Sequence, residues 1–263
     1  MRQGLFSREP IFATMSRFLS LVALICAFSN LVLSQSTCEL PGLFAPLFAC
    51  GDPVSFDGYD YATVAIGDQC WFQQNLRNDH YANGDAIPGE LSNSDWSNTT
   101  SGAQDYYQNN TDHLNDYGRL YNWYAVDDAR GLCPSGWHVP TDEEFQVLEA
   151  HLGTPESELD NWGWRGFAQN VGGQLKATGT EFWNSDNGGQ NTNSSGFTAL
   201  GAGYRTFDGG FSNWRISGFF WSASPHHGYG GNAISCILNH DATGVYRSSS
   251  DRRGGFSVRC VRD

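Results

Sequence analysis

The sequence offers few residues at spacings that support catalysis. No Gly-x-Ser-x-Gly, His-Glu-x-x-His, phosphate-loop or EF-hand pattern occurs in the 263 residues. His226, His227, Cys236 and His240 lie within fifteen residues, and the Cys-x-x-x-His spacing is compatible with zinc. A second ligand pair is missing, and Cys236 stands on an apolar face, so we interpret this set as a buried thiol beside a histidine-containing loop.

An oxygen-rich segment is the clearest candidate for a metal ion. Residues 184–195 are dense in the amide, hydroxyl and carboxylate oxygens that calcium prefers. The candidate ligands are Asn184, Asp186, Asn187, Asn191 and Asn193. Only Asp186 carries a formal charge, so the alternative is a turn-rich loop whose Asn and Asp side chains hydrogen-bond to its own backbone. Calcium is the cofactor that the sequence suggests.

Aromatic residues are abundant, with 9 Trp, 11 Tyr and 17 Phe. Exposed rings beside Asn and Asp side chains hold sugars by stacking and by hydrogen bonds to hydroxyl groups. Four tryptophans have Gly, Asn, Ser and Arg as sequence neighbours and are the expected sugar-binding residues on the surface: Trp96, Trp162, Trp164 and Trp214. A domain with few aliphatic strands also fills its core with rings, and we expect this for Trp71, Trp123, Trp137 and Trp221.

The start of the sequence indicates export. Arg17 is followed by an apolar run, residues 18–28, and then by small or polar residues up to Ser34. This is the pattern of a signal peptide, and the run is too short for a membrane-spanning helix. We interpret residues 1–34 as a signal peptide, with Met15 as an alternative start, and expect no integral membrane segment after cleavage.

Removal of residues 1–34 leaves six cysteines: Cys38, Cys50, Cys70, Cys133, Cys236 and Cys260. An even count suits an oxidising compartment, although the sequence does not choose among the pairings. A local Cys38–Cys50 bridge would tie down the leader. Buried free thiols are the alternative for Cys70 and Cys236.

The charge balance narrows the class of partner. The chain carries 15 basic and 28 acidic side chains, a formal net charge of −13. Such a surface repels nucleic-acid phosphates and anionic lipids, so we expect neither nucleic acid nor a membrane surface as partner. A glycan or a surface protein is the expected partner.

The elements that must position these residues form one predicted domain, residues 55–263, after an irregular leader of residues 35–54. Tyr59–Ile66 and Gln69–Leu76 predict a hairpin joined by Gly67 and Asp68. Residues 89–115 are rich in Ser, Asn, Asp, Thr and Gly and predict a long surface excursion.

Two helices are predicted. Apolar residues recur at steps of three and four over 117–125, after an Asn-Asp pair that would serve as N-cap. The second helix begins at a capping box of Thr141 and Glu144 and ends at Gly153.

Short strands are predicted in the second half, at Phe197–Arg205, Gly218–Ser224, Ala233–Asn239, Gly244–Ser248 and Phe256–Asp263. In the last of these, alternation places Phe256, Val258 and Cys260 on one inward face. Helices in the first half and short antiparallel strands in the second indicate an α+β domain.

Motifs in order from about Asp57 to the C-terminus resemble the Fibrobacter succinogenes major paralogous domain. They include residues 61–67 (Tyr-Ala-Thr-Val-Ala-Ile-Gly), 117–126 (Tyr-Gly-Arg-Leu-Tyr-Asn-Trp-Tyr-Ala-Val), 133–142 (Cys-Pro-Ser-Gly-Trp-His-Val-Pro-Thr-Asp) and 255–263 (Gly-Phe-Ser-Val-Arg-Cys-Val-Arg-Asp). The family is similar to formylglycine-generating enzymes and C-type-lectin-like domains. The resemblance therefore implies an irregular single α+β domain with two main helices, short antiparallel strands and neighbouring termini.

The resemblance also implies an exported bacterial protein and a disulfide. Lectin-like folds join an early helical region to the last strand, which corresponds to Cys133–Cys260 here. Cys70–Cys236 is then the remaining pair.

Three functional hypotheses follow. The first is a secreted or cell-surface, non-catalytic binding or adhesion domain that contacts a glycan or a protein through loops of the C-terminal half. The second is an enzyme on a formylglycine-generating-enzyme-like scaffold, although residues 218–224 lack the cysteines that this chemistry requires, so no catalytic residue is assigned. A passive surface component without ligand is a third. A pocket with perturbed acids and no disulfide at Cys236 would favour the enzyme.

Overall fold

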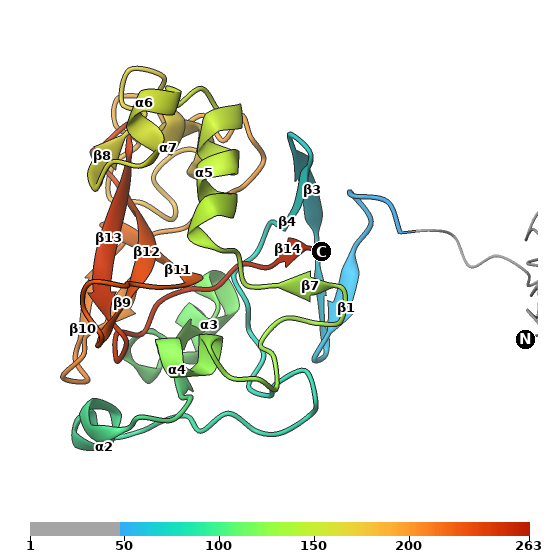
Figure 1. The fold of residues 1–263 in the computed structure, drawn as a ribbon, viewed down its shortest axis with the longest axis vertical. Helices are drawn as coiled ribbons and strands as arrows, with labels where there is room; N and C mark the ends of the chain where they lie inside the picture. Colours follow the sequence, from blue (N-terminus) through green and yellow to red (C-terminus); the bar gives the residue numbers. More distant parts are fainter. Residues whose placement is uncertain (1–47) are drawn as a thin grey trace, which may run out of the picture. The chain divides into compact units, whose positions relative to one another are not determined.

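The computed structural model describes residues 48–263, and within them the chain folds into four β-sheets and several short helices (Figure 1). In chain order the elements are β1 (Val54–Phe56), β2 (Tyr59–Tyr61), β3 (Thr63–Ile66), β4 (Gln69–Phe72), α2 (Asn93–Asn98), β5 (Gln104–Asp105), the 3₁₀ turn η1 (Tyr107–Asn109), α3 (Thr111–Tyr117), β6 (Leu120–Tyr121), α4 (Trp123–Val126), β7 (Trp137–His138), α5 (Asp142–His151), α6 (Glu156–Leu159), β8 (Gly163–Arg165), α7 (Val171–Leu175), β9 (Ala202–Arg205), β10 (Phe211–Trp214), β11 (Ser217–Pro225), β12 (Asn232–Asn239), β13 (Val245–Asp251) and β14 (Val261–Arg262).

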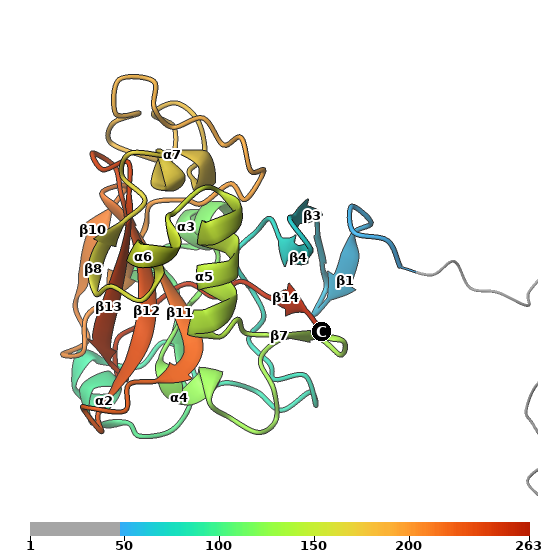
Figure 2. The same ribbon diagram turned by 45° about the horizontal axis from the view of Figure 1, so that its top comes forward.

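The largest sheet has six strands in the order β10-β9-β11-β12-β13-β8, and all its neighbours are antiparallel except β11 and β9. Helix α5 lies over one face of this sheet, and the smaller sheet β3-β4-β14-β7 lies on the far side of α5 (Figures 1 and 2). Phe145 and Leu148 of α5 pack between the layers with Trp71 and Phe220. A second core lies around Trp221 and the C-terminal segment.

The start of the described chain packs with the domain. Val54 pairs with Tyr61, and the rings of Phe48 and Trp137 are 5.6 Å apart. The guanidinium of Arg262 donates to the Phe48 carbonyl at 3.3 Å, so this start lies beside the C-terminus. Part of the expected leader thus belongs to the domain, whereas the expected signal peptide, residues 1–34, and Cys38 lie outside the described residues.

The predicted α5 is confirmed, including its capping box. The Thr141 hydroxyl accepts from the Glu144 N–H at 3.2 Å, and the Glu144 carboxylate accepts from the Thr141 N–H at 2.8 Å. The helix ends at His151, and Gly153 follows with φ +106°, a backbone conformation that favours glycine. The β3–β4 hairpin around Gly67 is confirmed as well.

The predicted helix over residues 117–125 is wrong. Helix α3 ends at Tyr117, and Gly118 has φ +77° and leaves no room for a Cβ, which would lie 2.8 Å from the Leu76 carbonyl oxygen. Leu120 and Tyr121 then pair with β5, and only residues 123–126 are helical. The close approach of Gly118 to the distant segment at Leu76 overrides the helical periodicity of the local sequence.

The predicted surface excursion over residues 89–115 is also wrong, because this segment contains α2, β5 and η1 and contributes buried residues. Asp105 is fully buried and forms an ion pair with Arg205. The Arg205 guanidinium also lies 4.3 Å from the ring centroid of Trp96. A buried cation therefore draws this polar segment into the fold.

Two of the predicted strands are shorter than expected, because only Ala202–Arg205 and Val261–Arg262 are paired strands. Phe256, Val258 and Cys260 are buried as expected, but Arg259 between them is buried too. Within the described residues, the fold is mixed α+β with two helices of seven or more residues, α3 and α5.

Arg259 is 1% exposed and has no carboxylate among its hydrogen-bond partners. Its guanidinium donates to the carbonyls of Phe72, Phe197 and Thr198 and to the Asn75 side chain at 2.9 Å. Burial lowers the pKa of Arg259 to about 9. The side chain therefore joins its own segment to two others through three of their main-chain oxygens.

We expect Arg259→Met to lower the free energy of unfolding by at least about 3 kcal/mol, because each carbonyl left without a donor costs about 1–3 kcal/mol. Urea denaturation followed by tryptophan fluorescence measures the loss. Arg262→Met removes an exposed guanidinium from the same segment and should cost less than about 1 kcal/mol. Equal losses in the two variants would contradict the role of Arg259.

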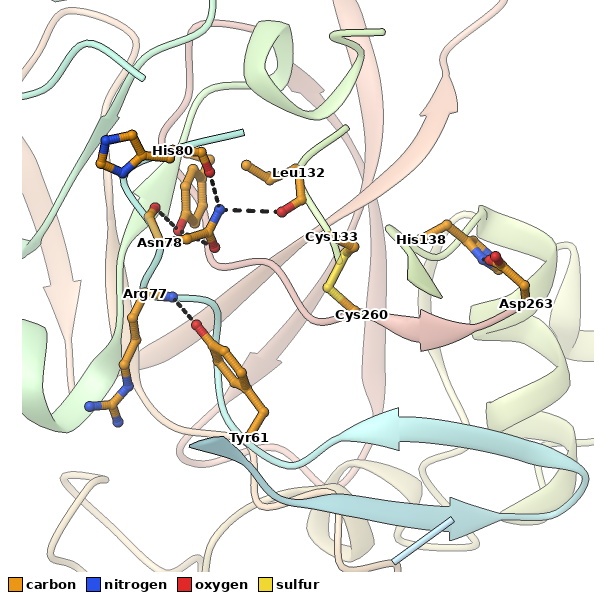
Figure 3. The surroundings of a disulfide bond; sticks show 10 residues. Tyr61, Arg77, Asn78, His80, Leu132, Cys133, His138, Cys260 and Asp263 are labelled. Atoms are coloured by element: carbon orange, nitrogen blue, oxygen red, sulfur yellow. Dashed lines mark hydrogen bonds and ion pairs between the residues drawn. A yellow bond between two sulfur atoms is a disulfide. The ribbon is translucent and has the colours of Figure 1, made fainter. Parts of the chain in front are cut away.

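His138 lies between two carboxylates at the C-terminal end of the domain. Its Nδ1 is 2.6 Å from Asp263, and its Nε2 is 2.8 Å from Glu144 of the α5 capping box. Figure 3 shows the contact between His138 and Asp263. Burial opposes the charged imidazole, but the hydrogen bonds to Asp263 and Glu144 outweigh it and raise the pKa of His138.

Because the folded-state pKa of His138 is raised, its stabilising effect is fully present below the unfolded pKa of about 6.5 and is lost as the pH rises through the folded value. We expect His138→Gln to destabilise the protein at pH 5 to 6 and to have a smaller effect at pH 9. Thermal unfolding across pH measures this difference. A destabilisation that is constant with pH, or equally present in His227→Gln, would exclude the ion pair as its cause.

Candidate functional site

The four tryptophans expected on the surface do not form one site. Trp96 is 0% exposed, and its indole N–H donates to the Arg253 carbonyl at 2.7 Å, so the prediction of a surface position was wrong. Trp162, Trp164 and Trp214 are 49%, 38% and 38% exposed. Among the rings expected in the core, three are buried (Trp71, Trp123 and Trp221), and Trp137 is only half-buried.

The exposed tryptophans lie in different surroundings. Trp162 packs on His226, with ring centroids 4.9 Å apart. Trp214 lies at the other edge of the six-stranded sheet and contacts rings of η1 and α3, including His113 at 4.9 Å. Trp164 continues into a row of side chains that crosses the sheet.

This row consists of five side chains across the six-stranded sheet. Cross-strand partners pair Trp164 with Tyr246, Tyr246 with Ile237, and Ile237 with Phe219. Tyr204 of β9 continues the row, because its ring is 4.4 Å from that of Phe219. Paired residues share a face, so the aromatic row crosses five strands and spans four interstrand spacings, about 19 Å.

All five residues of the aromatic row are half-buried or exposed, while their neighbours along the strands face the core. Arg165, Val245, Leu238 and Phe220 are each no more than 1% exposed. One face of the sheet therefore packs on α5 and its neighbouring segments, whereas the other is partly covered by the core around Trp221 and Phe256 and presents the row at its exposed part.

A hollow of about 210 Å³ lies along the aromatic row. It is lined by Tyr204, Phe207, Phe219, Ile237, Ser248, Ser250, Asp251, Gly254 and Phe256. The Ser250 hydroxyl lies 2.8 Å from that of Ser235. The hollow combines ring surfaces with hydroxyl groups and one carboxylate.

Asp251 is held in place by Arg253, whose Nε and Nη2 donate to its two carboxylate oxygens at 2.9 and 2.6 Å. The Arg253 hydrogen bond lowers the pKa of Asp251, which keeps the carboxylate ionised and able to accept hydrogen bonds. The neighbouring guanidinium offsets its charge. This arrangement suits hydroxyl donors of a neutral ligand.

The predicted calcium loop hydrogen-bonds largely to itself. The Asn193 side chain donates to the Thr198 hydroxyl at 2.9 Å and accepts from the Thr198 N–H at 2.8 Å. The Asn191 side chain donates to the Ser185 carbonyl at 3.3 Å. Calcium at Asn184, Asp186, Asn187, Asn191 and Asn193 stays a prediction, and the alternative of a turn-rich loop accounts for these contacts.

The cysteine pairing differs in part from expectation. Cys133 and Cys260 form the disulfide that the family resemblance implies, with Cα atoms 6.0 Å apart (Figure 3). Cys50 bonds to Cys70, so the Cys38–Cys50 and Cys70–Cys236 pairs were wrong.

Cys236 is a free, buried thiol on β12. The reason lies in the topology, because Cys70 belongs to the small sheet and Cys236 to the large one, with α5 between them. The His226, His227, Cys236 and His240 set likewise forms no metal-ligand cluster in the described part of the chain.

Two buried groups between α5 and the six-stranded sheet, Glu149 of α5 and Cys236 of β12, have features that an enzyme would use. Burial raises the pKa of Glu149 to about 7, against the opposing effect of its ion pair with Arg165. Burial also raises the pKa of the Cys236 thiol. Glu149 and Cys236 are 0% and 6% exposed, so neither reaches a surface where a substrate would bind.

The two disulfides suggest an oxidising location outside the cytoplasm. Among the described residues, no helix has the length and apolar character needed to cross a membrane.

The profile of the Fibrobacter succinogenes major domain matches residues 64–262. The chain belongs to this family. The matched span of this bacterial domain includes the whole aromatic row and the Cys133–Cys260 disulfide, whereas Cys50 precedes it. No curated protein matches the sequence, and no solved structure matches the fold.

Sequence reasoning identified only Trp164 of the aromatic row. Tyr204, Phe219, Ile237 and Tyr246 lie on four further strands, and their alignment depends on strand register. Alternation within each predicted strand was the available signal, but alternation alone does not show which strands are neighbours.

We expect Cys236 to resist iodoacetamide in the native protein, because its thiol is buried and its pKa is raised. After unfolding without reductant, Cys236 should be alkylated while Cys50, Cys70, Cys133 and Cys260 stay protected as disulfides. Peptide mass spectrometry of the two samples measures this pattern. Native alkylation of Cys236, or its recovery in a disulfide-linked peptide, would contradict the structure.

Proposed function

We propose that the protein is an exported, non-catalytic binding domain whose aromatic row holds a glycan. The observation that carries this proposal is the row Trp164, Tyr246, Ile237, Phe219 and Tyr204, lying beside a hollow with serine hydroxyls and a carboxylate. Rings supply the apolar surface on which pyranose faces stack, and the polar groups supply hydrogen bonds to sugar hydroxyls. The row lies on strands of the C-terminal half, and the loops there contribute Phe207, Gly254 and Phe256 to the hollow.

A neutral sugar chain suits this face better than an anionic one. The chain carries a net charge of −13, and Asp251 contributes a carboxylate to the hollow itself. Arg253 is already engaged by Asp251. Polyanionic glycans would therefore meet repulsion without a free cation in the hollow.

The tilts of the rings favour a single chain over a flat crystalline surface. Trp164 and Tyr246 meet at 74°, and Tyr204 and Phe219 at 41°. Rings at such angles cannot all stack on one plane. A soluble chain can turn its successive sugar units to match them.

Export is part of the proposal. Residues 1–34 have the pattern of a signal peptide, and the disulfides suit a secreted or cell-surface location. We also propose kinship with C-type-lectin-like and formylglycine-generating-enzyme-like folds. The irregular α+β architecture and the Cys133–Cys260 bridge to the C-terminal segment support this kinship.

An enzyme on the same scaffold has less support. Cys236 lacks a disulfide and Glu149 has a perturbed pKa, which are features expected of the enzyme. Both are buried between α5 and the six-stranded sheet, and residues 218–224 lack cysteine. The exposed chemistry is that of a binding surface.

A glycan array with and without a calcium chelator first identifies a ligand, and titration calorimetry with that oligosaccharide then tests the row. We expect Trp164→Ala and Tyr246→Ala each to weaken binding about tenfold, which corresponds to about 1.4 kcal/mol. Trp162→Ala and Trp214→Ala are matched controls, because they remove exposed rings outside the row, and they should bind as the unaltered protein does.

Two results would overturn the proposal. One is silence of the folded protein on the array in both conditions. The other is a ligand whose binding is lost in Trp162→Ala or Trp214→Ala and retained in the row variants. Loss of binding with the chelator alone would assign the ligand contact to a calcium-dependent surface in place of the row.

A further inference from the structure

Three metal-ligating side chains converge at a site separate from the aromatic row. Asp57, Asp79 and His80 each direct one ligand atom into a volume where all three atoms lie within 4.8 Å of one another. His80 Nδ1 is 2.7 Å from Asp79 Oδ1 and 3.7 Å from Asp57 Oδ2. We propose that these three residues bind a divalent transition metal, with zinc as the ion that best fits the donor set.

The separations of His80 Nδ1 from the two carboxylates are compatible with a zinc centre. Zinc lies about 2.05 Å from nitrogen and oxygen ligands in a tetrahedron, which separates neighbouring ligand atoms by roughly 3.3 Å. The distances from His80 to the two carboxylates, 2.7 and 3.7 Å, fall on either side of this value. Small side-chain rotations would equalise them.

His80 Nδ1 supplies an independent observation. This nitrogen is shielded from solvent and has no hydrogen-bond partner of acceptable geometry among the described residues, despite the nearby Asp79 oxygen. The nearest polar atoms are the two carboxylates, and the His80 side chain as a whole is 44% exposed. A metal ion between the nitrogen and the carboxylates would satisfy the nitrogen lone pair.

The ligands are held in place by the main chain around them. Asp57 occupies the β1–β2 turn with φ +48°, and its carboxylate accepts from the Asp79 N–H at 3.2 Å. The buried Asn78 side chain donates to the His80 carbonyl at 2.7 Å and to the Leu132 carbonyl at 3.2 Å (Figure 3). Because Leu132 precedes the Cys133–Cys260 disulfide, His80 rests on a covalently fixed segment.

The surrounding charges leave one oxygen of Asp79 for a metal. Arg119 lies 3.0 Å from Asp79 Oδ2 and balances part of the negative charge, while Oδ1 faces His80. An open hollow of about 280 Å³, lined by Asp57 and His80 among others, adjoins the site and has room for an exchangeable water. Three protein ligands plus an open position are typical of accessible zinc sites.

Calcium does not suit this donor set. It takes 6–8 oxygen ligands and avoids nitrogen, whereas the site offers two carboxylates and an imidazole. A bound zinc ion would join the β1–β2 turn to the segment at residues 79–80. The site would therefore stabilise the folded protein in a metal-dependent way.

Titration of tag-free, chelator-treated protein with zinc chloride tests the site. We expect saturable binding with about one equivalent, weakened at least tenfold in Asp57→Asn and in His80→Gln, and no saturable binding of calcium to these three residues. His227→Gln, which alters an exposed histidine elsewhere, should bind zinc as the unaltered protein does. Zinc should raise the melting temperature of the unaltered protein and of His227→Gln only.

Circular dichroism confirms that the variants are folded, and cobalt substitution gives a second readout on the unaltered protein. A cobalt spectrum with the strong visible bands of a four-coordinate centre supports the site. The weak spectrum of hydrated cobalt, the absence of saturable zinc binding, or zinc binding that survives in both Asp57→Asn and His80→Gln would each overturn the proposal.

Discussion

The fold depends on buried cations that hold irregular chain segments by their main-chain oxygens. Arg259 does this for the segments at Phe72 and at Phe197–Thr198, and Lys176 donates to the carbonyls of Asn239 and Ala242, both at 2.7 Å. Loops in a folded interior carry carbonyls that no sheet or helix satisfies, and leaving these unpaired is costly. A guanidinium or ammonium with several donors satisfies two or more of them at once.

Contacts between distant parts of the chain explain why some local predictions succeeded and others failed. Helix α5 was predictable because its capping box and its end lie within one stretch of sequence. Residues 117–125 carry a helical pattern too, but Gly118 must pass against the Leu76 carbonyl, and that contact comes from a distant part of the chain. Trp96 was likewise predicted at the surface, because the sequence does not show that Arg205 and the Arg253 carbonyl surround it.

The candidate sites were harder to predict because each is assembled from separate elements. The aromatic row needs the register of five strands, and a shift of one residue would turn its rings inward. Asp57 lies in the β1–β2 turn and His80 in a separate segment, and the sequence does not show that the two are neighbours. The Cys133–Cys260 bridge came from resemblance, whereas the Cys50–Cys70 bridge required knowing that the chain before β1 lies beside β4.

The distribution of chemistry between the two faces of the large sheet argues for recognition over catalysis. The groups with catalytic potential, Glu149 of α5 and Cys236 of β12, lie between the helix and the sheet, where packing shields them from solvent. The opposite face is exposed along the aromatic row, where its side chains are rings, serine hydroxyls and a carboxylate already fixed by an arginine. A nucleophile needs both activation and access to a substrate, and here the candidate groups lie where a substrate does not reach them. What remains exposed on rigid strands is a surface whose shape is set in advance, which is the property that binding an oligosaccharide requires.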